Sequence, residues 1–155
     1  MTTTETDLLA LDKQVCFALA ATNRAVLAVY RPLLEPLGLT HPQYLVMLAL
    51  WDHRGDSAPL SVKGIATLLR LDSATLSPML KRLEAIGLIT RARRAADERA
   101  TDVELTAAGV ELRTCALDIP PAVIARLGVD IAELEELHRV LTRINRAALA
   151  AGALA

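Results

Sequence analysis

The chain has 155 residues, which suits one folded domain with one sizeable core. Apolar residues make up 53% of the sequence and aromatic residues only 3%, so a helix-rich protein is expected. The formal net charge of −1 gives no overall attraction to a polyanion. No apolar run reaches the ~18 residues that cross a membrane, and the N-terminus lacks a secretory signal pattern. We therefore expect a cytoplasmic protein with no membrane partner.

The basic residues are concentrated in the middle of the chain. Residues 61–99 hold eight Lys and Arg against four Asp and Glu, a net charge of +4, which leaves −5 for the rest. This distribution is typical of a nucleic-acid-binding module. The two cysteines, Cys16 and Cys115, are too far apart in sequence to suggest a disulfide scaffold or a metal site, and we expect no cofactor. Each is either a small buried apolar residue or a reactive thiol.

The first third of the chain predicts two helices. A helical pattern runs from about residue 6 to residue 34, and Pro32 followed by residues 36–38 is expected to end it. Thr40 is then a favourable N-cap for a helix that reaches about Asp52. This second helix is almost wholly apolar, so we expect it to be buried on all sides at the centre of the domain.

A helix–turn–helix pattern follows. Ser61 is expected to cap a helix over residues 62–69, and residues 71–87 form a second, amphipathic helix. Either Asp72 or Ser73 caps that second helix and leaves a proline inside it, or Ser77 caps a shorter one. We favour the earlier start because it produces two helices joined by a short turn. The second helix is either an ordinary surface helix or one that enters the DNA major groove.

A basic hairpin follows the two helices. Gly87 is expected to end the second helix, and residues 88–93 and 100–105 read as strands around a charged tip at residues 94–99. Thr106 then caps a helix to about Leu117, which is interrupted at Ile119-Pro120-Pro121. A last helix covers about residues 130–149. The predicted fold class is mainly α with a small β-hairpin wing, a winged helix-turn-helix.

Polar side chains of the second helix and the hairpin are the candidate DNA contacts. Small hydroxyl groups let a helix approach base edges, and cations bind phosphates. We expect Arg99 to reach into a minor groove, held by Asp97. The full set of candidates is Ser73, Thr75, Ser77, Lys81, Arg82, Arg93, Asp97 and Arg99.

These residues carry a family resemblance. The segment 71–109, with Asp97-Glu98-Arg99 followed by Leu105-Thr106 and Gly109, resembles the DNA-binding lobe of the MarR family of bacterial regulators. The N-terminal half resembles the organic-hydroperoxide-sensing branch of that family, the OhrR regulators. The matching stretches are Leu11-Asp12, Gln14 to Leu19, Tyr30 to Leu34, Leu37 to Thr40 and Pro42 to Met47.

The resemblance implies a homodimeric repressor on a pseudopalindromic double-stranded operator, with organic hydroperoxides as inducers. It implies one domain over residues 1–155, with dimerisation helices at about 7–34 and 106–150 and the winged helix at about 60–105. It also implies that Cys16 is the peroxide-reactive thiol and that Tyr30 hydrogen-bonds it across the dimer. Oxidation of Cys16 would then release the operator.

Two positions depart from the family pattern, which often has an aromatic residue at 20 and a tyrosine at 41. This chain has Ala20 and His41. His41 either supports the thiolate, by a hydrogen bond or a positive charge, or simply faces solvent. Cys115 either resolves the oxidised Cys16 by forming a disulfide with it or is structural. If it is structural, a low-molecular-weight thiol forms that disulfide instead.

Two other functions have to be weighed. A thiol peroxidase would need repeated turnover and a reducing partner, and a basic winged helix has no use in such an enzyme. We therefore expect no enzymatic activity and no catalytic residues. A MarR-type regulator that binds a small aromatic or anionic ligand, with Cys16 as a packing residue, stays open as the alternative.

Overall fold

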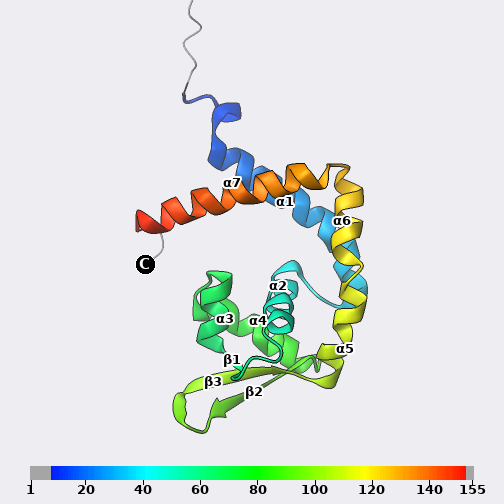
Figure 1. Cartoon of the computed structure of the whole chain (residues 1–155), viewed down its shortest axis with the longest axis vertical. Helices are drawn as coiled ribbons and strands as arrows, with labels where there is room; N and C mark the ends of the chain where they lie inside the picture. Colours follow the sequence, from blue (N-terminus) through cyan, green and yellow to red (C-terminus); the bar gives the residue numbers. More distant parts are fainter. Residues whose placement is uncertain (1–7, 153–155) are drawn as a thin grey trace, which may run out of the picture. The chain divides into compact units, whose positions relative to one another are not determined.

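The computed structural model describes residues 8–152 and confirms the predicted fold class, mainly helical with a winged helix-turn-helix. The chain divides into two compact units at Ile119/Pro120. The elements in chain order (Figure 1) are η1 (Leu11–Lys13), α1 (Val15–Leu34), η2 (Glu35–Leu37), α2 (His41–Asp52), β1 (Leu60–Ser61), α3 (Val62–Leu69), α4 (Ser73–Ala85), β2 (Ile89–Arg94), β3 (Asp97–Leu105), α5 (Ala107–Ala116), α6 (Ile119–Leu127) and α7 (Ile131–Ala150).

The first unit has its core between α2, α3 and α4 and one face of a three-stranded sheet (Figure 1). The most deeply buried side chains are Leu34, Val46, Met47, Ile65, Leu76, Leu80, Leu83, Ile89 and Val103. A capping box begins α2: the Thr40 N–H donates to Gln43 Oε1 at 3.0 Å, and the Gln43 N–H donates to Thr40 Oγ1 at 3.4 Å. The expectation that α2 is buried all round is wrong at Leu48, which is 39% exposed.

The first helix is shorter than predicted. It begins at Val15, because Gln14 is extended and separates α1 from the 3-10 turn η1, while residue 6 lies outside the described part of the chain. The Gln14 side-chain amide donates to the carbonyl of Leu8 at 2.5 Å, which ties this break to the preceding turn. Pro32 does not end the helix but lies inside its last turn. The chain leaves α1 through η2, which Gly38 closes with a φ of 69°.

The helix pair matches the prediction closely. Ser61 caps α3 by accepting the Gly64 N–H at 3.0 Å, and Arg70 turns the chain with a left-handed φ of 55°. Asp72 then caps α4 by accepting the Thr75 N–H at 2.6 Å. The earlier of the two predicted starts is therefore confirmed, with Pro78 inside the helix. Gly87, with a φ of 82°, follows its end as expected.

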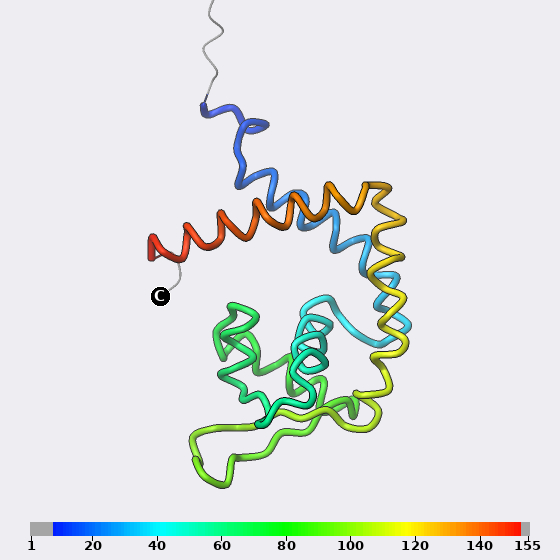
Figure 2. Tube along the Cα trace, viewed as in Figure 1, coloured from blue at the N-terminus to red at the C-terminus, as the bar shows by residue number. Residues whose placement is uncertain are grey.

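The hairpin differs from the prediction in its tip and in its strand number. Its strands extend through the charged residues to Arg94 and from Asp97, so Ala95 and Ala96 form the turn and the predicted tip at 94–99 is wrong. A short strand that the sequence did not predict, β1, pairs with β3 to give the antiparallel order β1-β3-β2. A strand of two residues is too short to show the alternation of apolar and polar side chains by which a strand is predicted from sequence. We call the β2–β3 hairpin the wing, and Figure 2 shows its tip extending past α3 of the same unit.

The chain after the wing holds one helix more than predicted. Thr106 caps α5 by accepting the Gly109 N–H at 3.1 Å. The expected break at Ile119-Pro120-Pro121 is instead the start of α6, because a missing N–H costs nothing in a first helical turn. In the second unit Asp130 precedes α7 and donates its N–H to Glu133 Oε2 at 3.3 Å. Among residues 8–152, no helix is long and apolar enough to cross a bilayer.

Candidate nucleic-acid interface and thiol region

Helix α4 presents the polar side chains expected of a DNA-reading helix, and we call it the reading helix. Ser73, Ser77 and Lys81 follow at four-residue steps and so lie on one face. The apolar face of the helix is buried through Leu76, Leu80 and Leu83. All five predicted contacts on this helix are exposed: Ser73, Thr75, Ser77, Lys81 and Arg82.

The N-terminus of the reading helix is held by a charged cap. The Thr75 backbone N–H donates to the Asp72 carboxylate, and this hydrogen bond lowers the pKa of Asp72. The carboxylate is therefore ionised at neutral pH and suits the positive end of the helix dipole. The cap fixes where the helix starts, and thereby which of its residues face outward.

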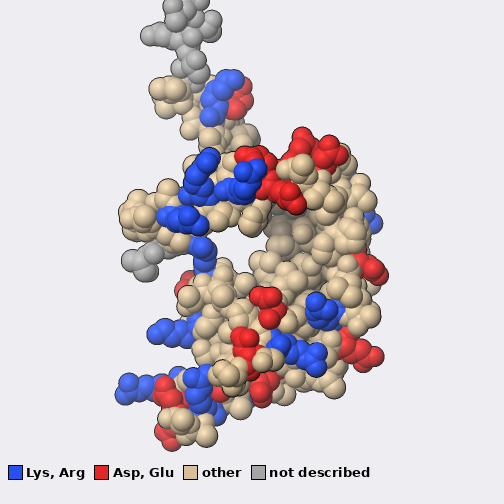
Figure 3. All heavy atoms as spheres, viewed as in Figure 1, with Lys and Arg blue, Asp and Glu red and all other residues tan. Residues whose placement is uncertain are grey.

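The wing carries the other predicted contacts. Arg93, Asp97 and Arg99 are all exposed. The Asp97 carboxylate accepts a hydrogen bond from the backbone N–H of Arg99 at 3.0 Å. The contact between the predicted pair thus shapes the backbone of the wing and does not involve the Arg99 guanidinium. Figure 3 shows Lys and Arg side chains gathered at its lower left, where Figure 1 places the free end of the wing.

Two further wing arginines form internal ion pairs that the sequence analysis did not find. Arg91 on β2 binds Glu84 of the reading helix, with an Nη2–Oε2 distance of 2.7 Å and a second bond from Nε at 3.1 Å. This guanidinium lowers the pKa of Glu84. Arg94 binds Asp102 with an Nη2–Oδ1 distance of 2.6 Å, and this carboxylate raises the pKa of Arg94. The packing of α4 against β2 brings Arg91 to Glu84, and the hairpin register brings Arg94 to Asp102, so no local sequence signal predicts either pair.

The two cysteines are free thiols, and both are exposed in the protomer. Cys16 stands in the first turn of α1 beside three exposed apolar residues, Val15 at 62%, Phe17 at 42% and Leu19 at 40%. Tyr30 is on the same helix, 14 positions further on, which corresponds to about 21 Å along the axis. Within one protomer Tyr30 therefore cannot bond Cys16. Cys115 lies in the last turn of α5.

Tyr30 belongs to a small cluster of rings. Its ring meets that of His41 edge to face, with the centroids 4.8 Å apart, and the ring of Tyr44 lies 6.1 Å from it. Burial lowers the pKa of His41, while burial and the neighbouring Tyr30 raise the pKa of Tyr44. At neutral pH this environment favours an uncharged imidazole at His41.

A pocket of about 600 Å³ connects this region with the reading helix. The residues that line it include the apolar Leu27, Leu34 and Leu39 and the charged Arg31, Glu35 and Arg82. Arg82, a predicted DNA contact, is thus also part of a pocket wall. The sequence showed no sign of this placement, because Arg31 and Arg82 are 51 positions apart.

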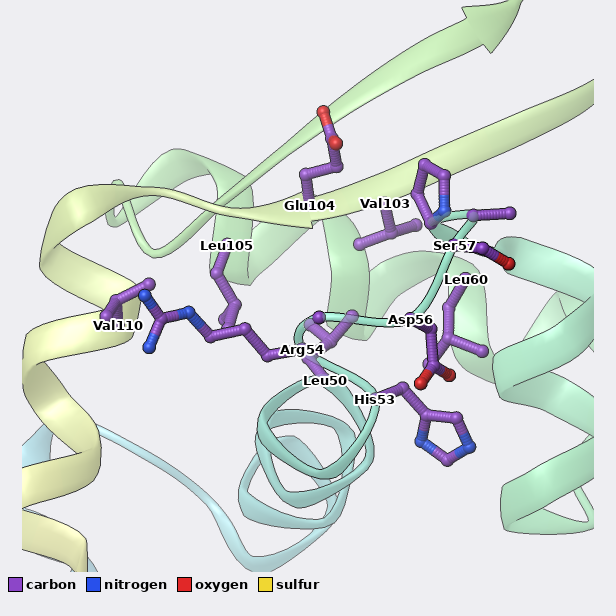
Figure 4. Close-up of a pocket in the computed structure, with 13 residues that line it drawn as sticks. Leu50, His53, Arg54, Asp56, Ser57, Leu60, Val103, Glu104, Leu105 and Val110 are labelled. Atoms are coloured by element: carbon purple, nitrogen blue, oxygen red, sulfur yellow. The ribbon is translucent and has the colours of Figure 1, made fainter.

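A second pocket, of about 370 Å³, lies between the loop after α2 and strand β3 (Figure 4). Leu50, Val103 and Leu105 line it, and the Arg54 side chain reaches toward Val110. The Glu104 side chain points away from this loop. Across residues 8–152, no three His, Cys, Asp or Glu side chains come together as metal ligands.

Comparison with known proteins identifies the family. The sequence model of the family described as transcriptional regulator SarA/Rot matches residues 28–114. The organic hydroperoxide resistance transcriptional regulator of Bacillus subtilis is 43% identical over 144 residues, which cover 90% of this chain and 95% of that protein. The chain belongs to the MarR family of transcriptional regulators, in its organic hydroperoxide resistance branch.

Solved structures of AbfR from Staphylococcus epidermidis are similar to this MarR-family chain. Reduced AbfR bound to DNA has a TM-score of 0.71 and 29% identity, over 90% of this chain and 94% of that one. The disulfide form of AbfR has a TM-score of 0.59 and 32% identity, over 88% of each chain. The relatives are transcriptional regulators, and the matched residues 28–114 include the whole winged helix but not Cys16.

Proposed function

We propose that this MarR-family chain is a homodimeric repressor that leaves its operator when an organic hydroperoxide oxidises Cys16. The observation that carries the proposal is the position of Cys16, an exposed thiol within an exposed apolar stretch of α1. The similarity to a hydroperoxide resistance regulator and to AbfR, known in a reduced DNA-bound form and in a disulfide form, supports it.

The DNA-binding part of the proposal rests on the winged helix. The reading helix enters the major groove, with Ser73, Thr75 and Ser77 near base edges and Lys81 and Arg82 near phosphates. The wing places Arg93 and Arg99 along the duplex, where Arg99 enters a minor groove. Two copies read pseudopalindromic half-sites about 34–36 Å apart, one turn of double-stranded DNA.

Exposed apolar side chains support the dimer. In the first unit Leu11, Val15, Phe17 and Leu19 are all at least 40% exposed. In the second unit α7 exposes Ile131, Leu137 and Ile144. Large apolar side chains left exposed in such numbers on these helices favour a subunit interface. We assign dimerisation to the helices at about 7–34 and 106–150, the winged helix to about 60–105, and both to one functional domain over residues 1–155.

The chemistry at Cys16 is a two-electron oxidation. The thiolate sulfur attacks the outer oxygen of the hydroperoxide, the O–O bond breaks, and the leaving alkoxide takes up a proton to become an alcohol. Cys16 becomes a sulfenic acid. The thiolate of Cys115 in the other subunit, or of a low-molecular-weight thiol, then attacks that sulfur and forms a disulfide with release of hydroxide, which becomes water. Tyr30 of the partner subunit orients the sulfur, and His41 packs against that tyrosine.

The switch follows from the place of the thiol. A sulfenic acid or disulfide adds bulk and polarity to a packed apolar interface, and such interfaces respond by changing between discrete arrangements. The separation of the two reading helices then no longer fits one DNA turn. A change in operator occupancy from 99% to 1% requires about 5.5 kcal/mol between the two forms.

The test compares wild type with Cys16→Ser. Both should bind the operator equally when reduced, and only wild type should leave it on addition of stoichiometric cumene hydroperoxide. Tyr30→Phe should bind normally and oxidise more slowly. Release of Cys16→Ser from its operator by peroxide would contradict the thiol switch.

A second candidate function is a response to a small aromatic or anionic ligand. The observation that favours it is the pocket of about 600 Å³ whose lining combines two arginines, Arg31 and Arg82, with apolar residues and one carboxylate, that of Glu35. An aromatic carboxylate fits that combination of groups. Benzoate should then release Cys16→Ser protein from DNA, and Arg31→Gln should remove that response.

A further inference from the structure

The wing contains an irregularity at its outer end. Arg93 pairs with Thr101 across the hairpin, but the next residue, Arg94, pairs with Asp97. Glu98, Arg99 and Ala100 of β3 therefore lie between two successive pairs and have no partners of their own in the β2–β3 register. Bulges of this kind re-aim side chains beside functional sites. The proposed DNA-contacting residue Arg99 is in the middle of this bulge.

The residue opposite the bulge, Arg94, is held from one side. Its Nε lies 3.1 Å from Oδ1 and 3.2 Å from Oδ2 of Asp102, and its Nη2 lies 2.6 Å from Oδ1. The Arg94 side chain is 38% exposed and that of Asp102 only 16%. Asp102 stands on the central strand, between its partners Ser61 on β1 and Ala92 on β2. The ion pair thus connects the outer end of the wing to the middle of the sheet.

We propose that Asp102 is a positioning residue for DNA recognition, because its carboxylate fixes Arg94 opposite the bulge that carries Arg99. This inference rests on the proposed function and extends it to a residue outside the DNA contacts. Asp102 also keeps the Arg94 guanidinium away from DNA phosphates. Two of the four wing arginines are held in ion pairs within the protein, Arg91 with Glu84 and Arg94 with Asp102. The other two, Arg93 and Arg99, are the ones proposed to bind DNA.

Stability alone is a poor reason for a carboxylate at this position. A central strand position with little exposure is stabilised at least as well by a β-branched or apolar side chain. The bidentate ion pair between Arg94 and Asp102 does fix geometry, because an arginine bound through two nitrogens is fixed in orientation as well as in distance. Fixing the strand opposite a three-residue bulge limits the directions in which Arg99 can point.

The test uses Asp102→Asn and a matched control, Glu104→Gln. Glu104 is an exposed carboxylate two positions away on the same strand, so both variants lose one negative charge. The probes are the duplex that wild-type protein enriches from a randomised pool and a scrambled duplex of equal composition. We expect the ratio of the two affinities to fall about tenfold in Asp102→Asn, within the range for lost base recognition, and to stay unchanged in Glu104→Gln.

The salt dependence provides a readout that a purely structural role would not change. In Asp102→Asn the freed Arg94 should bind a phosphate. The salt slope, which is the slope of log affinity against log salt concentration, should therefore steepen by about one unit per protomer relative to Glu104→Gln. Asp102→Glu, which keeps the carboxylate, should restore most of the affinity ratio. Equal affinity ratios and equal slopes in Asp102→Asn and Glu104→Gln would overturn this inference alone. Wild-type protein that enriches no duplex would overturn the proposed function as well.

Discussion

The indole Nε1 of Trp51 donates a hydrogen bond to the backbone carbonyl of Gly109 at 2.9 Å, across 58 positions of the sequence. Trp51 is in the last turn of α2 and is buried, and Gly109 is in the first turn of α5. The bond therefore joins the centre of the winged helix to the helix that follows the wing. It gives the buried indole the partner that such a group needs.

Replacing Trp51 by Phe should destabilise the protein by about 1–3 kcal/mol, because the variant loses both a buried hydrogen bond and part of the ring volume. Urea denaturation followed by circular dichroism measures the effect as a lower midpoint with an unchanged slope. An unchanged midpoint would show that the hydrogen bond from Trp51 to Gly109 contributes nothing to stability.

Gly109 should tolerate no side chain. A Cβ at this position would lie 2.1 Å from the backbone carbonyl oxygen of Leu88. Gly109→Ala should therefore cost about 2 kcal/mol or more, at the upper end of what overpacking costs. Gly64→Ala is the control, since its Cβ would meet only side-chain atoms, at 3.3 Å and beyond. Thermal melts of the two variants should differ clearly, and similar melting temperatures would refute the close approach at Leu88.

His41 should make stability depend on pH. Burial lowers its pKa in the folded protein, so the unfolded chain binds a proton more readily. The contribution of His41 is then complete above the unfolded pKa of about 6.5 and is lost as the pH falls through that value. His41→Phe keeps a ring beside Tyr30 and cannot titrate. Melting temperatures between about pH 7.5 and about pH 5 should fall more steeply in wild type than in the variant; parallel curves would exclude His41 as the titrating group.

The proposed DNA contacts should separate into two kinds. Arg99→Ala should weaken operator binding, by about 1–3 kcal/mol if the side chain reads a groove, while Lys81→Ala should mainly reduce the salt slope by about one unit per protomer. Arg54→Ala, which removes one exposed cation from the loop after α2, is the control for net charge. Fluorescence anisotropy at several salt concentrations measures both quantities. Operator affinity of Arg99→Ala equal to that of Arg54→Ala would remove the wing from the interface.

Cys115 should decide the form of the oxidised protein. If Cys115 resolves Cys16 of the partner subunit, peroxide-treated wild type should run as a disulfide-linked dimer on a non-reducing gel, and Cys115→Ser should not. If a small thiol resolves Cys16, wild type should stay monomeric on the gel and gain the mass of that thiol. Intact mass spectrometry with and without added small thiol distinguishes the two results.

Much of the fold was predictable from short stretches of sequence. The N-caps at Thr40, Ser61 and Thr106 and the glycine at 87 stand where the sequence placed them, and Asp72 is one of the two caps expected for the favoured start of the reading helix. Each depends on a side chain and a backbone group within three residues, so the signal is local. The helix, turn, helix and hairpin follow in order from these signals. The family resemblance also came from sequence, and the relatives confirm it.

Other features were decided by tertiary structure, because they depend on groups far apart in the chain. The register of β3 between β1 and β2 added the third strand, moved the turn to Ala95 and Ala96, and left Arg99 in a bulge. The same register brings Arg94 to Asp102, so one of the basic residues of the predicted hairpin tip is ion-paired within the sheet. The hydrogen bond between Trp51 and Gly109 likewise needs two elements to be packed before it can form. Side-chain periodicity within one segment reports which face is buried, but the partner on the other side of a contact comes from the packing of the whole unit.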